Sequence, residues 1–155
     1  MKKSILIYRT AQNAESVQKL IAELIEKGYS VQDVCLPEIA SRTAASEEEI
    51  KRLLSEKTED VDILVCIIDN VSHSDSICDW EVELAHSRSK VIVGVYSEGF
   101  SADTPIPRSL ELYRDHLVGC SAEKVASAIE GVQVVSENPD GSPKGKVWNV
   151  DKSEC

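Results

Sequence analysis

The chain is 155 residues long, with 42% hydrophobic and 5% aromatic residues, which is the size and composition of one folded domain rather than of a disordered segment. Its 17 basic and 27 acidic side chains give a formal net charge of -10, a field that repels polyanions, so we expect no nucleic-acid partner. The 5 cysteines include no C-x-x-C pair, so the sequence indicates neither a disulfide framework nor a zinc site, and we expect no bound metal.

The beginning of the chain does not resemble a secretion signal. Met1, Lys2 and Lys3 lead into an apolar segment that is too short for the hydrophobic region of a signal peptide. No apolar run approaches the roughly 20 residues that a membrane-spanning helix needs. We therefore expect a cytoplasmic protein without a membrane partner.

Short segments rich in Ile and Val alternate along the chain with segments of helical spacing, a pattern typical of a parallel β-sheet. The predicted strands cover residues 4–8, 30–34, 61–69, 90–97 and 116–119. The third and fourth are almost continuously hydrophobic, as strands covered on both faces are, so we expect them at the centre of the sheet.

The segments between the strands carry signals for the starts and ends of helices. Apolar side chains at helical spacing predict a helix over residues 14–27, which Gly28 terminates. Ser46 precedes three glutamates and resembles a capping box, because acidic groups stabilise the positive end of a helix, so we interpret these glutamates as a cap rather than as a metal site. Ser121 and Gly131 flank the last predicted helix.

This alternation predicts an α/β fold, a three-layer sandwich in which a five-stranded parallel sheet has the flavodoxin-like order 2-1-3-4-5. The domain takes up residues 1–131. Residues 132–155 contain prolines, glycines and many polar side chains, so we expect a polar C-terminal extension there.

Polar side chains follow two of the predicted strands at their carboxyl ends. Tyr8 and Arg9 end the first strand, and Asp69 and Asn70 end the third. Ligands of doubly wound sheets bind beyond this edge, so these residues are candidates for binding a substrate.

The helix predicted after the third strand places two glutamates in opposite environments. At about 100° per residue, Glu81 falls within the apolar face, whereas Asp79, Glu83 and His86 fall on the solvent side. A carboxylate in an apolar face costs on the order of a few kcal/mol unless it is paired, hydrogen-bonded or next to a cavity. Two interpretations stay open: Glu81 bonds Arg88 or a neighbouring loop in an architectural role, or it lines a cleft at the carboxyl edge of the sheet.

Residues 77–85, I-C-D-W-E-V-E-L-A, followed by K-V-I-V-G-V at residues 90–95, resemble TIR-like domains, the Toll/interleukin-1 receptor relatives of bacterial NAD-consuming immune proteins. These proteins include the TIR-like component of Thoeris anti-phage systems, which the segment also resembles. In that family a polar loop with Ser precedes a helix that reads W-[VC]-x-x-E-[IL]-x-x-A, and a strand like K-x-I-I-G-V follows. The spacing of this motif from Glu to Ala85 selects Glu81, as the helical periodicity does.

The resemblance extends over residues 4–131 through the segments P-I-P at 105–107 and L-V-G-C at 117–120. Two departures are evident. The first Trp of the family's helix motif is Ile77 here, with Trp80 three residues later, and the loop after the first strand reads Y-R-T where many members have Ser-Tyr or Ser-His.

The resemblance implies an enzyme that breaks the bond between nicotinamide and ribose in NAD and then hydrolyses the ADP-ribosyl group or cyclises it into a signalling nucleotide. NAD is the substrate, so no cofactor is implied, and the partners implied are self-association and a separate effector that receives the nucleotide. Glu81 is the implied catalytic group, since a fixed anion stabilises the oxocarbenium-like ribose more than the substrate. The implied substrate contacts are Tyr8 and Trp80 for ring stacking, Arg9 for the pyrophosphate, and Ser74 and Ser76 for the ribose.

Other interpretations of the same residues stay open. Tyr8 and Trp80 suit the core, Ser74 and Ser76 suit a helix cap, and Cys78 suits either a buried or a reactive thiol. His73 is a loop residue that either transfers protons or is simply exposed. The alternative functions are a catalytically silent TIR-like interaction module and an enzyme similar to nucleoside deoxyribosyltransferases, which share the sandwich and use a carboxylate at a C–N glycosidic bond.

Overall fold

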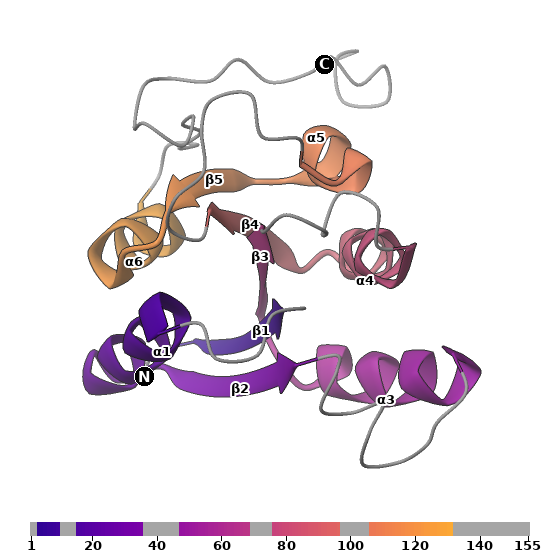
Figure 1. Cartoon of the computed structure of the whole chain (residues 1–155), viewed down its shortest axis with the longest axis horizontal. Helices are drawn as coiled ribbons and strands as arrows, with labels where there is room; N and C mark the ends of the chain where they lie inside the picture. Colours follow the sequence, from indigo (N-terminus) through magenta and orange to yellow (C-terminus); the bar gives the residue numbers. More distant parts are fainter. Residues whose placement is uncertain (1–2, 10–14, 36–46, 69–75, 97–105, 132–155) are drawn as a thin grey trace.

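The computed structural model describes residues 3–9, 15–35, 47–68, 76–96 and 106–131, which form one parallel sheet between two layers of helices (Figure 1). The strands are β1 (Ser4–Arg9), β2 (Ser30–Cys35), β3 (Ile63–Ile68), β4 (Val91–Tyr96) and β5 (His116–Gly119). The helices are α1 (Glu15–Glu26), α3 (Glu47–Glu59), α4 (Ser76–Ser87), α5 (Arg108–Tyr113) and α6 (Ala122–Glu130).

The five strands pair in parallel in the order β2-β1-β3-β4-β5, which confirms the predicted topology. β3 lies in the middle, and every one of its side chains is buried, as its unbroken hydrophobic sequence predicts. β3 begins later than predicted, because Val61 still belongs to the turn after α3, where its N–H donates to the carbonyl of Thr58. Its predicted last residue, Asp69, lies outside the described residues.

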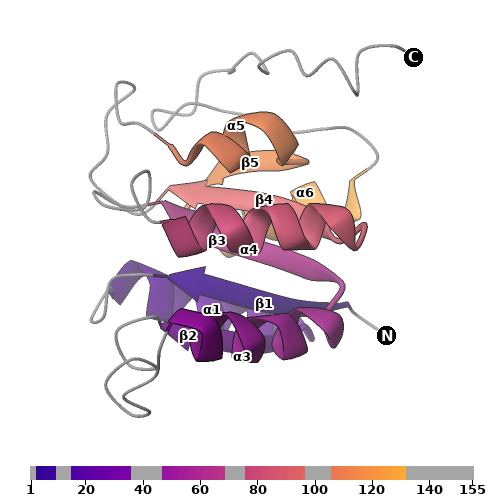
Figure 2. The ribbon, with the colours of Figure 1, turned by 90° about the vertical axis from the view of Figure 1, so that its right-hand side faces the viewer.

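The two faces of the sheet are covered by different helices (Figures 1 and 2). Alternate strand residues such as Ile5 and Val65 pack with α1 and α6 in one core cluster. Their neighbours, such as Leu6 and Leu64, pack with α3, α4 and α5 in a second cluster. We call these the α1/α6 layer and the α3/α4/α5 layer, and together with the sheet they make the predicted three-layer sandwich.

Local signals place the ends of two helices as predicted. Gly28 follows α1 with a φ of 99°, a left-handed conformation that glycine adopts without strain. Ser121 caps α6, because its side-chain oxygen accepts a hydrogen bond from the Lys124 N–H at 3.3 Å. α3 begins at Glu47 with acidic residues in its first turn, while its predicted cap, Ser46, lies outside the described residues.

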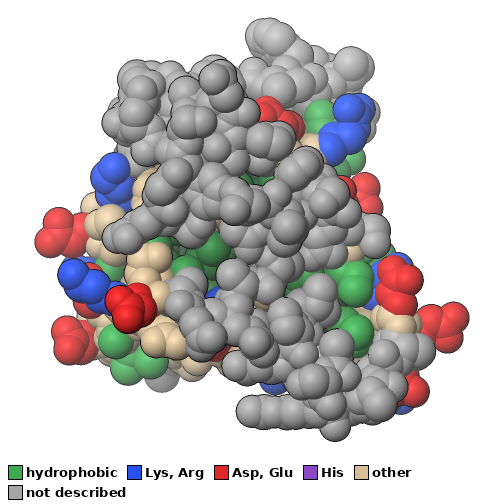
Figure 3. Space-filling view, in the orientation of Figure 1, with side chains coloured by type: hydrophobic (Ala, Val, Ile, Leu, Met, Phe, Trp, Pro, Cys, Tyr) green, Lys and Arg blue, Asp and Glu red, His purple; other side chains and the backbone are tan. Residues whose placement is uncertain are grey.

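The surface carries the acidic character of the sequence. Acidic side chains lie along both flanks of the molecule, over the helices of the two outer layers (Figure 3). None of the described helices has both the length and the apolar character needed to cross a bilayer. The predicted C-terminal extension, residues 132–155, lies outside the described residues.

Candidate active site

Glu81 lies in α4 with its side chain turned into the α3/α4/α5 layer, where its exposed fraction is 0%. Its neighbours on the helix, Cys78, Val82 and Ala85, are buried in the same layer, which confirms the apolar face predicted from periodicity. Glu81 Oε1 forms a short hydrogen bond with the hydroxyl of Thr58 on α3. The carboxyl is therefore held between two helices.

No described cation bonds to the Glu81 carboxyl. Arg88, the partner that the architectural interpretation names, instead donates to the carbonyl and hydroxyl oxygens of Ser55, both at 2.7 Å, and pairs with Glu59 at 3.4 Å. The other carboxyl oxygen, Glu81 Oε2, is buried without a hydrogen-bond partner among the residues that the structure describes. A buried carboxyl that lacks both a cation and a full set of donors is an energetically unfavourable group.

This environment changes the protonation of Glu81. Burial raises its pKa from 4.5 to about 7, although the hydrogen bond from Thr58 and the charge of Arg88 both act to lower it. Near neutral pH the carboxyl therefore exchanges between its neutral and ionised forms, which is the condition for a group that takes part in acid, base or electrostatic chemistry.

Two of the other predicted site residues share a layer with Glu81. Tyr8, at the end of β1, is 1% exposed and belongs to the same core cluster. Trp80 is partly buried against that cluster, and the ammonium of Lys51 lies 5.5 Å from the centroid of its ring. Tyr8 is thus a core residue, and Trp80 lies at the outer side of the contact between α3 and α4.

Arg9 belongs to the opposite face of the sheet. It alternates with Ile5 and Ile7, which face the α1/α6 layer, and it makes a two-pronged ion pair with Asp33 of β2, with Nε–Oδ1 and Nη2–Oδ2 distances of 2.9 and 2.8 Å. A contact between Arg9 and the pyrophosphate of a substrate stays a prediction. The alternation of Ile5, Ile7 and Arg9 is the sequence signal that separates Arg9 from Glu81.

Several predicted residues lie where the structure gives no side-chain description. Asp69, Asn70, His73 and Ser74 are outside the described residues. Ser76 begins α4, and only its backbone is described. Among the predicted site residues, the structure therefore places Glu81, Tyr8 and Trp80 in the α3/α4/α5 layer.

One placement was predicted wrongly. Asp79 is only partly exposed: its Oδ1 accepts hydrogen bonds from the N–H and the hydroxyl of Ser109, at 3.0 and 2.5 Å, and so satisfies a donor in the first turn of α5. Helical periodicity gives the direction of a side chain but not the neighbouring helix that covers it. Glu83 and His86 are exposed as predicted, and His86 stacks on the ring of Tyr113.

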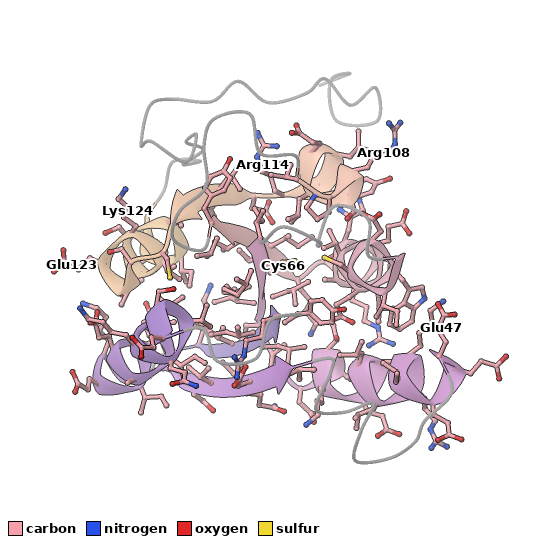
Figure 4. All side chains as sticks on the ribbon, viewed as in Figure 1. Glu47, Cys66, Arg108, Arg114, Glu123 and Lys124 are labelled. Atoms are coloured by element: carbon pink, nitrogen blue, oxygen red, sulfur yellow. The ribbon has the colours of Figure 1, made fainter. Side chains whose placement is uncertain are left out.

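Two contacts of the candidate site were not predicted. Thr58 continues the spacing of Ile50 and Leu54 along the buried stripe of α3, so a polar residue at an apolar position was the available signal. The thiols of Cys66 and Cys78 lie 3.1 Å apart, and Figure 4 shows the Cys66 sulfur pointing from β3 toward α4. No comparable signal in the sequence pairs these two cysteines.

The described residues offer one further hollow and no metal-binding cluster. A hollow of about 170 Å³ lies between α1 and the start of α6, lined in part by Ser16, Lys19 and Cys120, in the layer opposite to Glu81. The described residues contain no cluster of three His, Cys, Asp or Glu side chains that suits a metal ion. No protein-family model matches the chain, and no curated protein matches it.

Proposed function

We propose that the protein is an NAD glycohydrolase or ADP-ribosyl cyclase in which Glu81 stabilises the ribose cation. The observation that supports this most is the state of the Glu81 carboxyl: it is fully buried, it bonds no described cation, and its Oε2 has no partner among the described residues. An architectural carboxyl normally has its oxygens hydrogen-bonded, because an unsatisfied buried acceptor costs about 1–3 kcal/mol. The unfilled oxygen suits the hydroxyl of a bound ribose.

The chemistry needs one carboxylate and no metal. The C–N bond between ribose and nicotinamide breaks, its electron pair leaves with nicotinamide, and nicotinamide departs as a neutral molecule, so no acid has to protonate it. Positive charge develops on the ribose, and the ionised Glu81 stabilises that charge more than it stabilises the substrate. Water then attacks the cation in hydrolysis, or a nucleophilic group of the same molecule attacks it in cyclisation, and a proton is released.

The burial of Glu81 adds a requirement to this proposal. Because its exposed fraction is 0%, the residues around it must move before a ribose can reach Oε2. We therefore expect a resting enzyme that becomes active on self-association or on a trigger from an infecting phage. In this proposal the ADP-ribose-type product is a cytoplasmic signal for a separate effector protein.

The decisive experiment is a mass-spectrometric analysis of NAD incubated with the wild-type protein, with and without phage-infected lysate. We expect release of nicotinamide by the wild type and a loss on the order of 10²–10³-fold in Glu81→Gln. Glu83→Gln, an exposed residue of the same helix, is the matched control and should retain full activity. Turnover that Glu81→Gln leaves unchanged would overturn the proposal, as would the absence of turnover in every condition.

A catalytically silent TIR-like interaction module is the second candidate, and the complete burial of Glu81 beside Thr58 favours it. In that case sedimentation would show self-association that Glu81→Gln does not alter, and no condition would release nicotinamide. A reaction with a deoxynucleoside and a free base, analysed in the same way, would instead detect transfer of a deoxyribosyl group.

A further inference from the structure

Thr58 is buried near the end of α3, with an exposed fraction of 0%, and its hydroxyl has two acceptors within reach. One is the backbone carbonyl of Leu54, at an oxygen–oxygen distance of 2.7 Å. The other is Glu81 Oε1 on α4. A threonine hydroxyl carries one proton, so it cannot donate to both oxygens at the same time.

The protonation state of Glu81 decides which of the two oxygens the Thr58 hydroxyl donates to. When the carboxyl is neutral, its O–H donates to Thr58 Oγ1, and the Thr58 hydroxyl donates to Leu54 O. When the carboxyl is ionised, the Thr58 hydroxyl turns and donates to Glu81 Oε1. The Leu54 carbonyl stays hydrogen-bonded after this change. It lies four residues before Thr58 and therefore also accepts the helical hydrogen bond from the Thr58 N–H. Both forms are hydrogen-bonded without movement of any heavy atom.

We propose that Thr58 is the positioning residue of Glu81: its hydroxyl reverses the direction of one hydrogen bond when the carboxyl gains or loses its proton, and thereby fixes Oε1 and directs Oε2 to the substrate. This inference rests on the proposed function, in which the ionised Glu81 faces the ribose. Thr58 itself does not touch the reacting atoms. It keeps the carboxylate oriented during each change of charge.

The described titratable groups near Glu81 do not hold its carboxyl as Thr58 does. Arg88 acts on Glu81 through its charge, but its hydrogen bonds go to Ser55 and its ion pair to Glu59. On α3, the Lys51 ammonium lies over the Trp80 ring and pairs with Glu47. The titratable side chains of the other elements packed against α4 are Cys66 on β3, Tyr96 on β4, and Arg108, Glu111 and Tyr113 on α5. Cys66 contacts Cys78, Glu111 pairs with Arg114, and Tyr113 stacks on His86. Among the described groups, Thr58 alone is hydrogen-bonded to the Glu81 carboxyl.

Two substitutions separate the hydroxyl from the shape of the side chain. Thr58→Val keeps the branched shape and removes the hydroxyl, whereas Thr58→Ser keeps the hydroxyl. Thr58→Val removes the bond to the ionised carboxyl and also the weaker bond to the neutral carboxyl, so the titration should shift by the difference between the two, about one pH unit. In Thr58→Val we therefore expect the pH–rate midpoint for NAD cleavage to rise by about one unit. At pH 7 kcat should fall by about fivefold, while KM changes by less than about twofold. Thr58→Ser should keep the wild-type midpoint.

A direct titration tests the same contact without activity. Protein with ¹³C-labelled glutamate carboxyls is titrated by NMR, and the Glu81 signal is identified by its loss in Glu81→Gln. We expect this signal to titrate at higher pH in Thr58→Val and at the wild-type pH in Thr58→Ser. Ser55→Ala, which removes a partner of Arg88, measures the effect of the nearby charge for comparison.

The two readouts distinguish failure of this inference from failure of the proposed function. NAD cleavage whose pH profile and NMR titration are the same in Thr58→Val as in the wild type would overturn the role of Thr58 alone. A shifted NMR titration in a protein that never cleaves NAD would overturn the proposed function, and with it the part of Thr58 in positioning Glu81 toward a substrate. If Thr58→Val does not fold by circular dichroism, Thr58→Ala is used under the same criteria.

Discussion

The two helical layers fill the space beside the sheet in different ways. The buried side chains of α1 and α6 are Val, Leu and Ala only, within the described residues. In the other layer, α3, α4 and α5 each bury a polar side chain: Thr58, Glu81 and Ser109. Those three are bonded across helix boundaries, Thr58 to Glu81 and Ser109 to Asp79. The buried side chains of the helices in the α1/α6 layer therefore pack through apolar contacts, whereas the helices of the α3/α4/α5 layer also bury polar contacts that fix how they meet.

The largest loss of stability should come from a substitution in the α1/α6 layer. Leu24 of α1 is 0% exposed, and Leu24→Ala should lower the free energy of unfolding by about 3 kcal/mol, because the methyl groups are lost and a cavity remains. Its neighbour Ile25 is 54% exposed, so Ile25→Ala should change stability by about 0.5 kcal/mol or less. Urea unfolding followed by circular dichroism measures both. Equal losses in the two variants would mean that α1 does not pack as described.

The next effect is a pH dependence of stability, which we expect from the α3/α4/α5 layer because it contains the buried Glu81. Since burial raises the pKa of Glu81 above its ordinary 4.5 to about 7, the folded state holds the proton more tightly than the unfolded chain does. The associated stability is complete below about pH 4.5 and is lost as the pH rises through about 7. Between about pH 5 and about pH 8 the contribution of Glu81 should fall by about 2.5 kcal/mol.

Urea unfolding at these two pH values tests this expectation in the wild type and in Glu81→Gln. The free energy of unfolding should fall between the two pH values by about 2.5 kcal/mol more in the wild type than in Glu81→Gln, because glutamine does not titrate. Glu83→Gln serves as the comparison, since Glu83 is exposed and its removal should leave the pH dependence in place. An identical pH dependence in the wild type and Glu81→Gln would show that Glu81 titrates as it does in water.

A smaller effect concerns the polar contact between α4 and α5. Asp79→Ala removes the acceptor for both the N–H and the hydroxyl of Ser109, and should cost about 1.5 kcal/mol. Glu83→Ala, on the exposed side of the same helix, controls for helix propensity. A double-mutant cycle with Ser109→Ala isolates the hydroxyl bond, because the N–H of residue 109 is kept in that variant, and it should show a coupling energy of about 1 kcal/mol. Additive losses in the cycle would contradict the hydroxyl contact.

The smallest loss of stability should come from a polar contact at the edge of the α1/α6 layer. The Tyr29 hydroxyl donates to Glu130 Oε2 at 2.5 Å, which joins the start of β2 to the end of α6. Tyr29→Phe keeps the ring in the core and should cost about 1 kcal/mol, because the exposed Glu130 carboxylate regains water when the bond is lost. Thermal unfolding of Tyr29→Phe beside Asp79→Ala ranks the two contacts. A larger loss of stability in Tyr29→Phe than in Asp79→Ala would contradict the expectation that the α3/α4/α5 layer has the stronger polar contact.

Three features could be predicted from the sequence alone: the strand order, the end of α1 at Gly28 and the apolar face that contains Glu81. The end of α1 and the apolar face of α4 depend on local periodicity and on backbone preferences, which act between residues that are close along the chain. The strand order follows from the alternation of strands and helices together with the right-handed connection of parallel strands. The partners of the polar side chains became known from the packed structure: Thr58 rather than Arg88 for Glu81, Asp33 for Arg9, and Ser109 for Asp79. Each of these contacts joins two separate elements, and the angle of a side chain around its own helix or strand contains no information about which group lies opposite.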